Sequence, residues 1–218
     1  MDYRSLLTVP LAALALSASG ADTLRQPTGW TAGASFAWPG GKTHEAGVAP
    51  DTDSNGRPAL TVKALGERKA YEVGSVDQSV MGYGGKRVRF SAQVKMTGVD
   101  RWAGLAIGVG WGPLYMRPLA DEGTRARGAQ GCPEWCDVSV VADIPADSNG
   151  VVNVGLALVG SGQVWARGFK LEIVGNEVPV TEQSFGAEAA AAFKAMVAEN
   201  QARLRKEPPR PPQNLSLQ

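Results

Sequence analysis

An alternation of apolar and polar residues with a period of two is the feature that most constrains this chain. It is clearest in residues 86–95, where Val88, Phe90, Ala92 and Val94 alternate with polar or charged residues. Because successive side chains of a strand point to opposite faces, this segment predicts a β-strand with one buried face. Similar segments, bounded by turn residues, lie at residues 102–111, 137–144, 152–159 and 164–174, and weaker ones lie near 34–38, 58–65 and 75–81.

About eight such strands with long connections predict an all-β fold, an antiparallel jelly-roll β-sandwich that we place at residues 28–178. The 27 glycines and 14 prolines are consistent with the many turns that such a fold requires. The formal net charge of +1 provides no protein-wide field that would attract nucleic acid or an anionic membrane. We therefore expect no nucleic-acid partner.

Residues 1–21 predict a signal peptide. Arg4 precedes an apolar run over residues 6–18, and small residues follow at 18–21. The run is shorter than the roughly 20 residues that span a bilayer, so we expect no stable membrane insertion. The alternative, a buried helix at the start of a cytosolic domain, leaves the small residues unexplained. We therefore expect an exported protein, periplasmic or secreted.

The two cysteines, Cys132 and Cys136, enclose the segment Pro-Glu-Trp. In the oxidising compartment that export implies, such a pair predicts a local structural disulfide. A redox-active pair normally has two intervening residues and a helix behind it, and neither is found here. The single histidine, His44, does not complete a structural zinc site with two cysteines.

The composition changes after Val180. Residues 184–206 are rich in alanine and carry apolar residues at helical spacing, which predicts an amphipathic α-helix with Ser184 as its N-cap. Four prolines in residues 207–218 predict an extended Pro-rich tail. The helix is expected either to pack on the sandwich or to dock a protein partner or a second copy of the chain.

Some segments are informative beyond their periodicity. They are Tyr-Gly-Gly-Lys-Arg-Val-Arg-Phe-Ser-Ala-Gln-Val-Lys at 83–95, Trp-Ala-Gly-Leu at 102–105, Gly-Trp at 29–30 and Gly-Ser-Gly-Gln-Val-Trp at 160–165. They resemble a family of bacterial jelly-roll domains similar to the galactose-binding-like carbohydrate-binding modules. Its members occur alone in exported proteins or appended to regulators, and most are uncharacterised. The resemblance implies a jelly roll over residues 29–174 and does not specify a ligand.

The chain departs from this family pattern in two places. Ala106 and Gly108 stand where a Trp and an Arg usually follow the Trp-Ala-Gly-Leu motif. Arg167 and Gly168 stand where an acidic pair is common, which puts in doubt the structural calcium that related modules hold there. The short strand Asn-Leu-x-Phe-Glu that usually precedes Gly29-Trp30 is missing, whereas Asn-Leu-Ser-Leu-Gln at 214–218 resembles it. We therefore expect the tail to add an edge strand, in cis or to a second copy, the alternative being a frayed terminus.

Support for catalysis is slight. No Gly-x-Ser-x-Gly motif accompanies His44, which is expected at the surface or in a loop beside Glu45. Some jelly rolls are glycoside hydrolases, which use two carboxylates facing one groove. Asp137 and Asp143 on one predicted strand are the candidates for such a pair. A jelly-roll glycoside hydrolase is therefore the third functional alternative.

A calcium ion is the only cofactor that the sequence suggests. Asp51, Asp53, Asn55 and Gly56 copy the first half of a calcium-binding loop. The twelfth position is Val62 rather than Glu, and Asp, Asn and Gly are also the residues expected in a turn between strands. The two alternatives are a structural calcium site and an ordinary turn.

The binding hypothesis rests on the strand at 102–111, whose Gly104, Ala106, Gly108 and Gly110 leave one face nearly bare. A flat ligand could approach this face, or the C-terminal helix could pack on it. Polar side chains from strands expected beside it, together with aromatic rings at its ends, suit the hydroxyl edges and apolar faces of sugars. The expected ligand-binding residues are Arg89, Ser91, Gln93, Trp102, Trp111, Tyr115, Asp137, Ser139, Asp143 and Asn153.

These observations together predict an exported, non-catalytic binding module whose ligand is a carbohydrate. The alternative is a structural or assembly protein in which the helix at 184–206 and the tail at 207–218 dock a protein partner or form a homo-oligomer.

Overall fold

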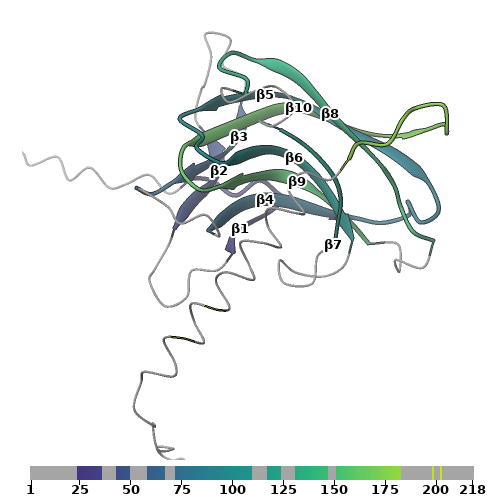
Figure 1. Ribbon diagram of the computed structural model, residues 1–218, viewed down its shortest axis with the longest axis horizontal. Coiled ribbons are helices and arrows are strands. Elements are labelled where there is room, and N and C mark those ends of the chain that lie inside the picture. Colours follow the sequence, from purple (N-terminus) through teal and green to yellow (C-terminus); the bar gives the residue numbers. More distant parts are fainter. Residues whose placement is uncertain are drawn as a thin grey trace, which may run out of the picture.

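The structure, a computed structural model, describes most of the predicted sandwich. The described residues are 24–35, 43–49, 58–66, 72–109, 117–123, 131–146 and 151–182, with 198 and 202, and at 33–35 and 117–123 only the backbone is described. They form two antiparallel sheets that lie one over the other (Figure 1). The predicted all-β, antiparallel architecture is therefore confirmed.

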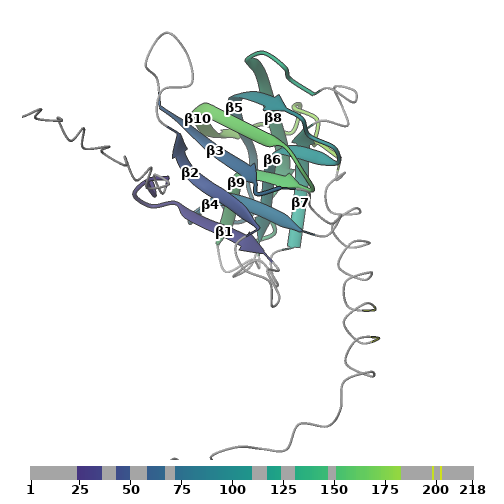
Figure 2. The same ribbon diagram turned by 90° about the vertical axis from the view of Figure 1, so that its left-hand side faces the viewer.

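The described residues form ten strands in two five-stranded sheets. Sheet I has the order β2-β3-β10-β5-β8 and sheet II the order β1-β4-β9-β6-β7. Figure 2 shows β2, β3 and β10 side by side in sheet I. The strands are β1 (Thr31–Ser35), β2 (His44–Ala49), β3 (Ala59–Ala64), β4 (Val73–Val80), β5 (Arg87–Thr97), β6 (Trp102–Val109), β7 (Arg117–Gly123), β8 (Cys136–Asp143), β9 (Val152–Val159) and β10 (Gln163–Val174).

The expectation of about eight strands was too low, because it missed β2 and β7. β7 is the edge strand of sheet II and contains Pro118 and charged residues, both of which are common on edge strands and interrupt an alternating pattern. β2 contains Gly47 and a single β-branched residue, so its propensity is weak. Pairing with neighbouring strands, rather than local sequence, makes these segments extended.

The core lies between the sheets and is built from the apolar half of each alternating strand. In β5 the side chains of Val88, Phe90, Ala92 and Val94 are buried, as the alternation predicts. Phe90 stacks on Phe169 of β10, with ring centroids 5.7 Å apart. Burial of each such large apolar side chain contributes about 1.5–3 kcal/mol, so this face fixes the register of β5.

The N-terminal end of the described chain contacts β2 at one point. Arg25 forms an isolated antiparallel bridge with Val48 of β2, whose amide nitrogen donates to the Arg25 carbonyl oxygen at 2.8 Å. Gly47 allows this approach, since a Cβ there would lie 2.8 Å from the same oxygen. Residues 207–218 lie outside the described residues, so the edge strand expected from the tail stays a prediction.

His44 is buried, and the expectation of a surface or loop position is wrong. It begins β2, and only 2% of its surface is exposed. Gly74 of β4 leaves the room for its ring, because a Cβ there would lie 2.6 Å from the His44 Cγ. The ring nitrogens lie 3.0 Å from the Thr43 Oγ1 and 3.3 Å from the Gly160 carbonyl oxygen. The fold thus encloses His44 as a hydrogen-bonded core residue.

The predicted disulfide between Cys132 and Cys136 is confirmed. Cys132 is buried, and its carbonyl oxygen accepts a hydrogen bond of 2.7 Å from the Met96 amide at the end of β5. The loop that enters β8 is therefore fixed both covalently and to the neighbouring strand.

The predicted terminal segments lie largely outside the described residues. This holds for the signal peptide at 1–21 and for the helix at 184–206, of which only residues 198 and 202 are described, both with helical backbone. In the described part of the chain, no helix has the length and hydrophobicity needed to cross a membrane.

Candidate functional site

A groove of about 730 Å³ lies on the outer face of sheet I, over β10, β5 and β8. The residues that line it from β5 and β8 are mainly those that alternate with the core positions, so their side chains point away from the core. The lining residues are Arg89, Ser91, Ala92, Gln93, Asp137, Val138, Ser139, Gly168, Lys170 and Glu172.

Strand register arranges the groove in three transverse rows. Each row takes one outward-facing residue from β10, one from β5 and one from β8. The rows are Glu172-Arg89-Val141, Lys170-Ser91-Ser139 and Arg167-Gln93-Asp137. Val141 is buried, and neither it nor Arg167 lines the groove itself.

Short side chains make the middle of the groove hollow. Ser91 and Ser139 face each other across β5 and β8, and long side chains stand in the rows on either side. β10 has a bulge between Arg167 and Lys170, where Gly168 has a φ of +65° and no atom lies within 4 Å of the place its Cβ would occupy. The bulge therefore adds an open, side-chain-free position to the hollow.

An ion pair bounds one end of the groove. The Arg89 Nη2 lies 3.4 Å from the Glu172 Oε2, joining β5 to β10. Both side chains are partly exposed, so the pair contributes little to folding stability. Its guanidinium and carboxylate groups remain within reach of a ligand as hydrogen-bonding groups.

An aromatic side chain stands at the other end. The guanidinium carbon of Arg167 lies 4.0 Å from the ring centroid of Trp135, and its Nε donates to the Gln93 Oε1 at 3.1 Å. Trp135 belongs to the loop that the Cys132–Cys136 disulfide closes. The disulfide thus holds an indole ring beside the row that contains Gln93.

The structure brings five of the predicted ligand-binding residues together. The five residues that line the groove are Arg89, Ser91, Gln93, Asp137 and Ser139.

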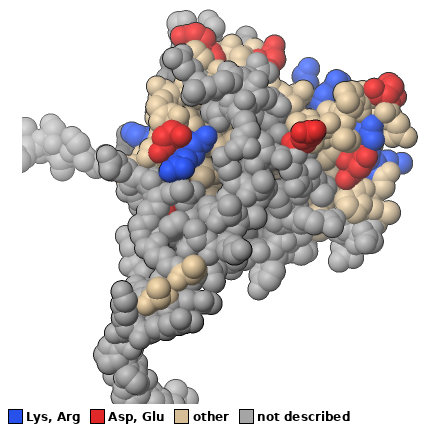
Figure 3. Space-filling model, viewed as in Figure 1, with Lys and Arg blue, Asp and Glu red and all other residues tan. Residues whose placement is uncertain are grey.

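Figure 3 shows that basic and acidic side chains are intermixed on the described surface in that view, rather than segregated by sign.

Trp102 and Asn153 lie elsewhere, on the outer face of sheet II. The expectation that β6 lies beside β5 and β8 is wrong, because β6 pairs with β9 and β7 in the other sheet. Trp102 is only 1% exposed and packs in an apolar cluster with Val73, Ala157 and Val159. Asn153 is buried and accepts a hydrogen bond of 2.6 Å from the Ser79 hydroxyl.

The bare face of β6 is also largely closed. Gly104 and Gly108 are buried and Ala106 is half-buried, so this face does not present the open surface that the binding hypothesis assumed. The predicted C-terminal helix, the other expected occupant of this face, lies outside the described residues except for two positions.

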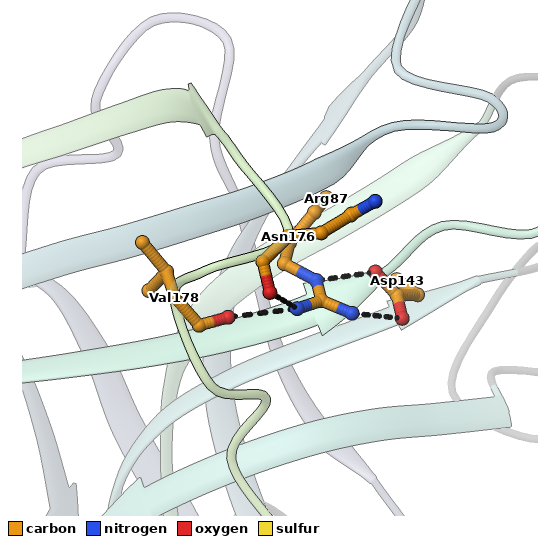
Figure 4. A network of polar contacts seen from close by, with 4 residues as sticks. All are labelled: Arg87, Asp143, Asn176 and Val178. Atoms are coloured by element: carbon orange, nitrogen blue, oxygen red, sulfur yellow. Dashed lines mark hydrogen bonds and ion pairs between the residues drawn. The ribbon is translucent and has the colours of Figure 1, made fainter.

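Asp143 is held by Arg87 at the end of β8 (Figure 4). The Arg87 Nε and Nη2 donate to the two Asp143 carboxylate oxygens at 2.7 and 2.8 Å. The Nη1 donates to the carbonyl oxygens of Asn176 and Val178, at 2.8 Å each. These hydrogen bonds lower the pKa of Asp143 below its ordinary value. Arg87 therefore ties the segment after β10 to Asp143 at the end of β8, and Asp143 does not line the groove.

This arrangement argues against the predicted carboxylate pair of a hydrolase. Asp137 and Asp143 are six residues apart on β8, or about 20 Å at roughly 3.3 Å per residue. The two carboxylates of glycoside hydrolases stand about 5–9.5 Å apart. Asp137 and Asp143 therefore cannot act on one glycosidic bond.

Several other predicted positions lie outside the described residues. These are Trp111 and Tyr115, and the calcium-loop residues Asp51, Asp53 and Asn55. Within the described ranges, no three or more His, Cys, Asp or Glu residues cluster as metal ligands.

The sequence-based prediction missed the contribution of β10 and of the disulfide loop. The one signal was Gly168, an isolated glycine in a strand, which is typical of a bulge. The bulge reverses which residues of β10 face outward, and no local pattern places Trp135 against Arg167. The missed residues are Trp135, Arg167, Gly168, Lys170 and Glu172.

Comparison with known protein sequences gives one partial relative. No protein-family model matches the chain. It is 33% identical over 104 residues to "Uncharacterized HTH-type transcriptional regulator YbfP" of Bacillus subtilis (strain 168). The match covers 45% of this chain and 32% of that protein, so the chain corresponds to about a third of its relative.

Solved structures with a similar arrangement include carbohydrate-binding modules. A structure described as "CBM4 structure and function" has a TM-score of 0.47 at 15% identity and covers 66% of this chain and 86% of its own. The CBM22-1 xylan-binding domain of Paenibacillus barcinonensis Xyn10C has a TM-score of 0.45 at 14% identity, and the match covers 74% of this chain and 92% of that domain. A putative sugar binding protein of Bacteroides thetaiotaomicron VPI-5482 has a TM-score of 0.46 at 12% identity, and the match covers 66% of this chain and 87% of that protein. Likeness at this level does not specify a ligand.

Proposed function

We propose that this chain is a non-catalytic binding module and that the groove on sheet I binds carbohydrate. The observation that carries the proposal is the row structure of the groove, in which arginine, lysine, glutamine, serine and carboxylate side chains converge on a shallow hollow. Sugars offer hydroxyl groups that both donate and accept hydrogen bonds, and such mixed, planar polar groups match them.

Two further features support a sugar over a purely polar ligand. Trp135 does not line the groove itself but contacts Arg167, which donates to Gln93 of the groove. The ring face that Arg167 leaves uncovered is of the kind that packs against the apolar C–H faces of sugar rings. Ala92 and Val138, whose side chains are buried, also line the groove next to Ser91 and Ser139, so part of its floor is backbone and leaves space for a flat ring. No described pair of carboxylates on β8 has hydrolase spacing, so binding without catalysis is the function that the groove supports best.

We also propose that the chain is exported to the periplasm or secreted. The Cys132–Cys136 disulfide supports this location, because disulfides persist in oxidising compartments. The signal-peptide pattern at residues 1–21 supports it independently. The partial match to a regulator fits a module that recurs in proteins of different architecture.

A glycan array probed with the full chain tests the proposal, followed by calorimetry with the strongest ligand. Replacing Gln93 by Ala is expected to weaken binding about tenfold, since it removes a hydrogen-bonding side chain from the groove. Lys63→Ala is the matched control, because Lys63 is exposed on β3 of the same sheet and outside the groove. An array without binding, or equal losses in both variants, would contradict the proposal.

A further inference from the structure

A lysine and two serines form the middle row of the groove. We infer that Lys170, together with Ser91 and Ser139, binds the carboxylate of an acidic glycan, one that contains uronic acid residues. This inference rests on the proposed carbohydrate-binding function of the same groove and adds the chemical class of its ligand.

The bulge in β10 is what brings Lys170 into the groove. Before the bulge, Trp165 and Arg167 pair with outward-facing residues of β5, whereas after it Lys170 and Glu172 do so. One extra residue in a strand exchanges its two faces. Without the bulge at Gly168, Lys170 would point toward the core. The register instead sets it directly opposite Ser91.

Lys170 differs from Arg89, the other cation that lines the groove, in having no carboxylate beside it among the described residues. The acidic residues of the groove are Asp137 and Glu172, and Glu172 forms an ion pair with Arg89. The Arg167 guanidinium lies over the Trp135 ring. Lys170 has no ion-pair partner among the described residues. Its ammonium group stands on the central row, beside the open position at Gly168.

The two serines complete a set of donors for a carboxylate. Ser91 lies between Lys170 and Ser139 in the row, so an ammonium and two hydroxyl groups point out from three adjacent strands. An ionised carboxylate only accepts hydrogen bonds, and bonds to it from a charged donor are shorter and stronger than neutral ones. A neutral sugar hydroxyl at this place would also accept from the Lys170 ammonium, but it lacks the second charge that a carboxylate brings to the bonds with the ammonium and with both serines.

A panel of paired glycans tests the inference with the full chain. Oligogalacturonate is paired with its methyl ester, and glucuronoxylan with unsubstituted xylan, so that each pair differs mainly in its carboxylates. Alginate oligomers, which consist of uronic acid residues, complete the panel together with carrageenan oligomers, which carry sulfate groups but no carboxylate. We expect an acidic ligand to bind about tenfold more tightly than its neutral partner, with a preference that declines as salt is added.

Lys170→Met is expected to abolish that preference, so that the acidic and neutral partners of each pair bind with equal affinity. Lys63→Met removes the same charge from β3, outside the groove, and is expected to leave the preference intact. Thermal unfolding of both variants verifies that they fold. Tight binding of neutral glycans alone, or an acidic preference that survives Lys170→Met, would overturn the inference but not the proposed function. Binding of carrageenan without any uronate would overturn the carboxylate assignment, and silence of the whole panel would overturn both.

Discussion

The guanidinium of Arg167 lies over the indole ring of Trp135, with its central carbon 4.0 Å from the ring centroid. This contact joins β10 to the loop that the Cys132–Cys136 disulfide closes, and Arg167 also donates to Gln93 in the groove. Trp135 and Arg167 are half-buried, and cation–π stacking of such a pair contributes about 0.5–2 kcal/mol, too little to hold a free loop in place. The disulfide therefore provides the constraint, and the stacking sets where the ring lies.

A double Cys132→Ala, Cys136→Ala variant tests that constraint. For so short a loop, the loop-closure model assigns the disulfide about 2 kcal/mol of unfolding free energy. We expect a loss of this size in urea unfolding, and weaker glycan binding because Trp135 is no longer held beside Gln93. Trp135→Ala with the disulfide intact is the matched variant, expected to lose binding with a smaller loss of stability. Unchanged binding in both variants would remove Trp135 from the site.

Filling the open position at Gly168 tests the hollow of the groove. Gly168→Asn places a side chain where no atom lies within 4 Å, and asparagine tolerates a φ of +65° better than most residues. We expect glycan affinity to fall about tenfold with little change in folding stability. Gly98→Asn is the control, since Gly98 has a φ of +59° and does not line the groove. Equal affinity in the two variants would show that the ligand does not enter the hollow.

The pairing of Asp143 with Arg87 predicts a loss of stability in acid. Hydrogen bonds from Arg87 lower the pKa of Asp143, so the carboxylate stabilises the folded state fully at pH values above its ordinary pKa of 3.8. This stabilisation is lost as the pH falls through the lowered folded pKa. Urea unfolding between pH 7 and pH 2 is expected to show a smaller acid loss in Asp143→Asn than in the parent chain. Parallel curves for the two proteins would contradict the pairing in solution.

Asp77 on the outer face of sheet II predicts the opposite pH dependence. Burial raises its pKa, and a hydrogen bond from Ser75 only partly offsets this. Its ionisation therefore costs folding stability, a cost that is absent at low pH and appears as the pH rises through the raised folded pKa. We expect Asp77→Asn to raise the unfolding temperature at pH 7 more than at pH 3. An equal change at both values would mean that the carboxylate is fully solvated.

Local periodicity predicts the strands well where one face packs on the core. The predicted strand at 86–95 corresponds to β5, and its apolar residues are those that the structure buries. Side-chain alternation is a property of the strand itself, so a single sequence reveals it. For the same reason, the outward-facing Arg89, Ser91 and Gln93 could be identified as surface residues before their neighbours were known.

Neighbouring strands could not be predicted in the same way. β5 and β6 are consecutive in the chain but lie in different sheets, since β6 pairs with β9 and β7. Strand pairing depends on contacts between residues far apart in sequence, which alternation does not encode. The predicted site therefore mixed residues of two opposite faces, with Gln93 on one and Trp102 on the other. Likewise, only the bulge at Gly168, a feature of the pairing with β5, brings Lys170 outward.

The central claim is that carbohydrate binds over β10, β5 and β8, and NMR titration of the full chain tests it most directly. The titrant is the strongest ligand from the glycan array. If carbohydrate binds in the groove, the largest changes in amide chemical shift are expected at Ser91, Gln93, Asp137, Ser139 and Lys170, with no change in β6. Shifts confined to Gly104, Ala106 and Gly108 on sheet II, with the groove residues unmoved, would contradict it.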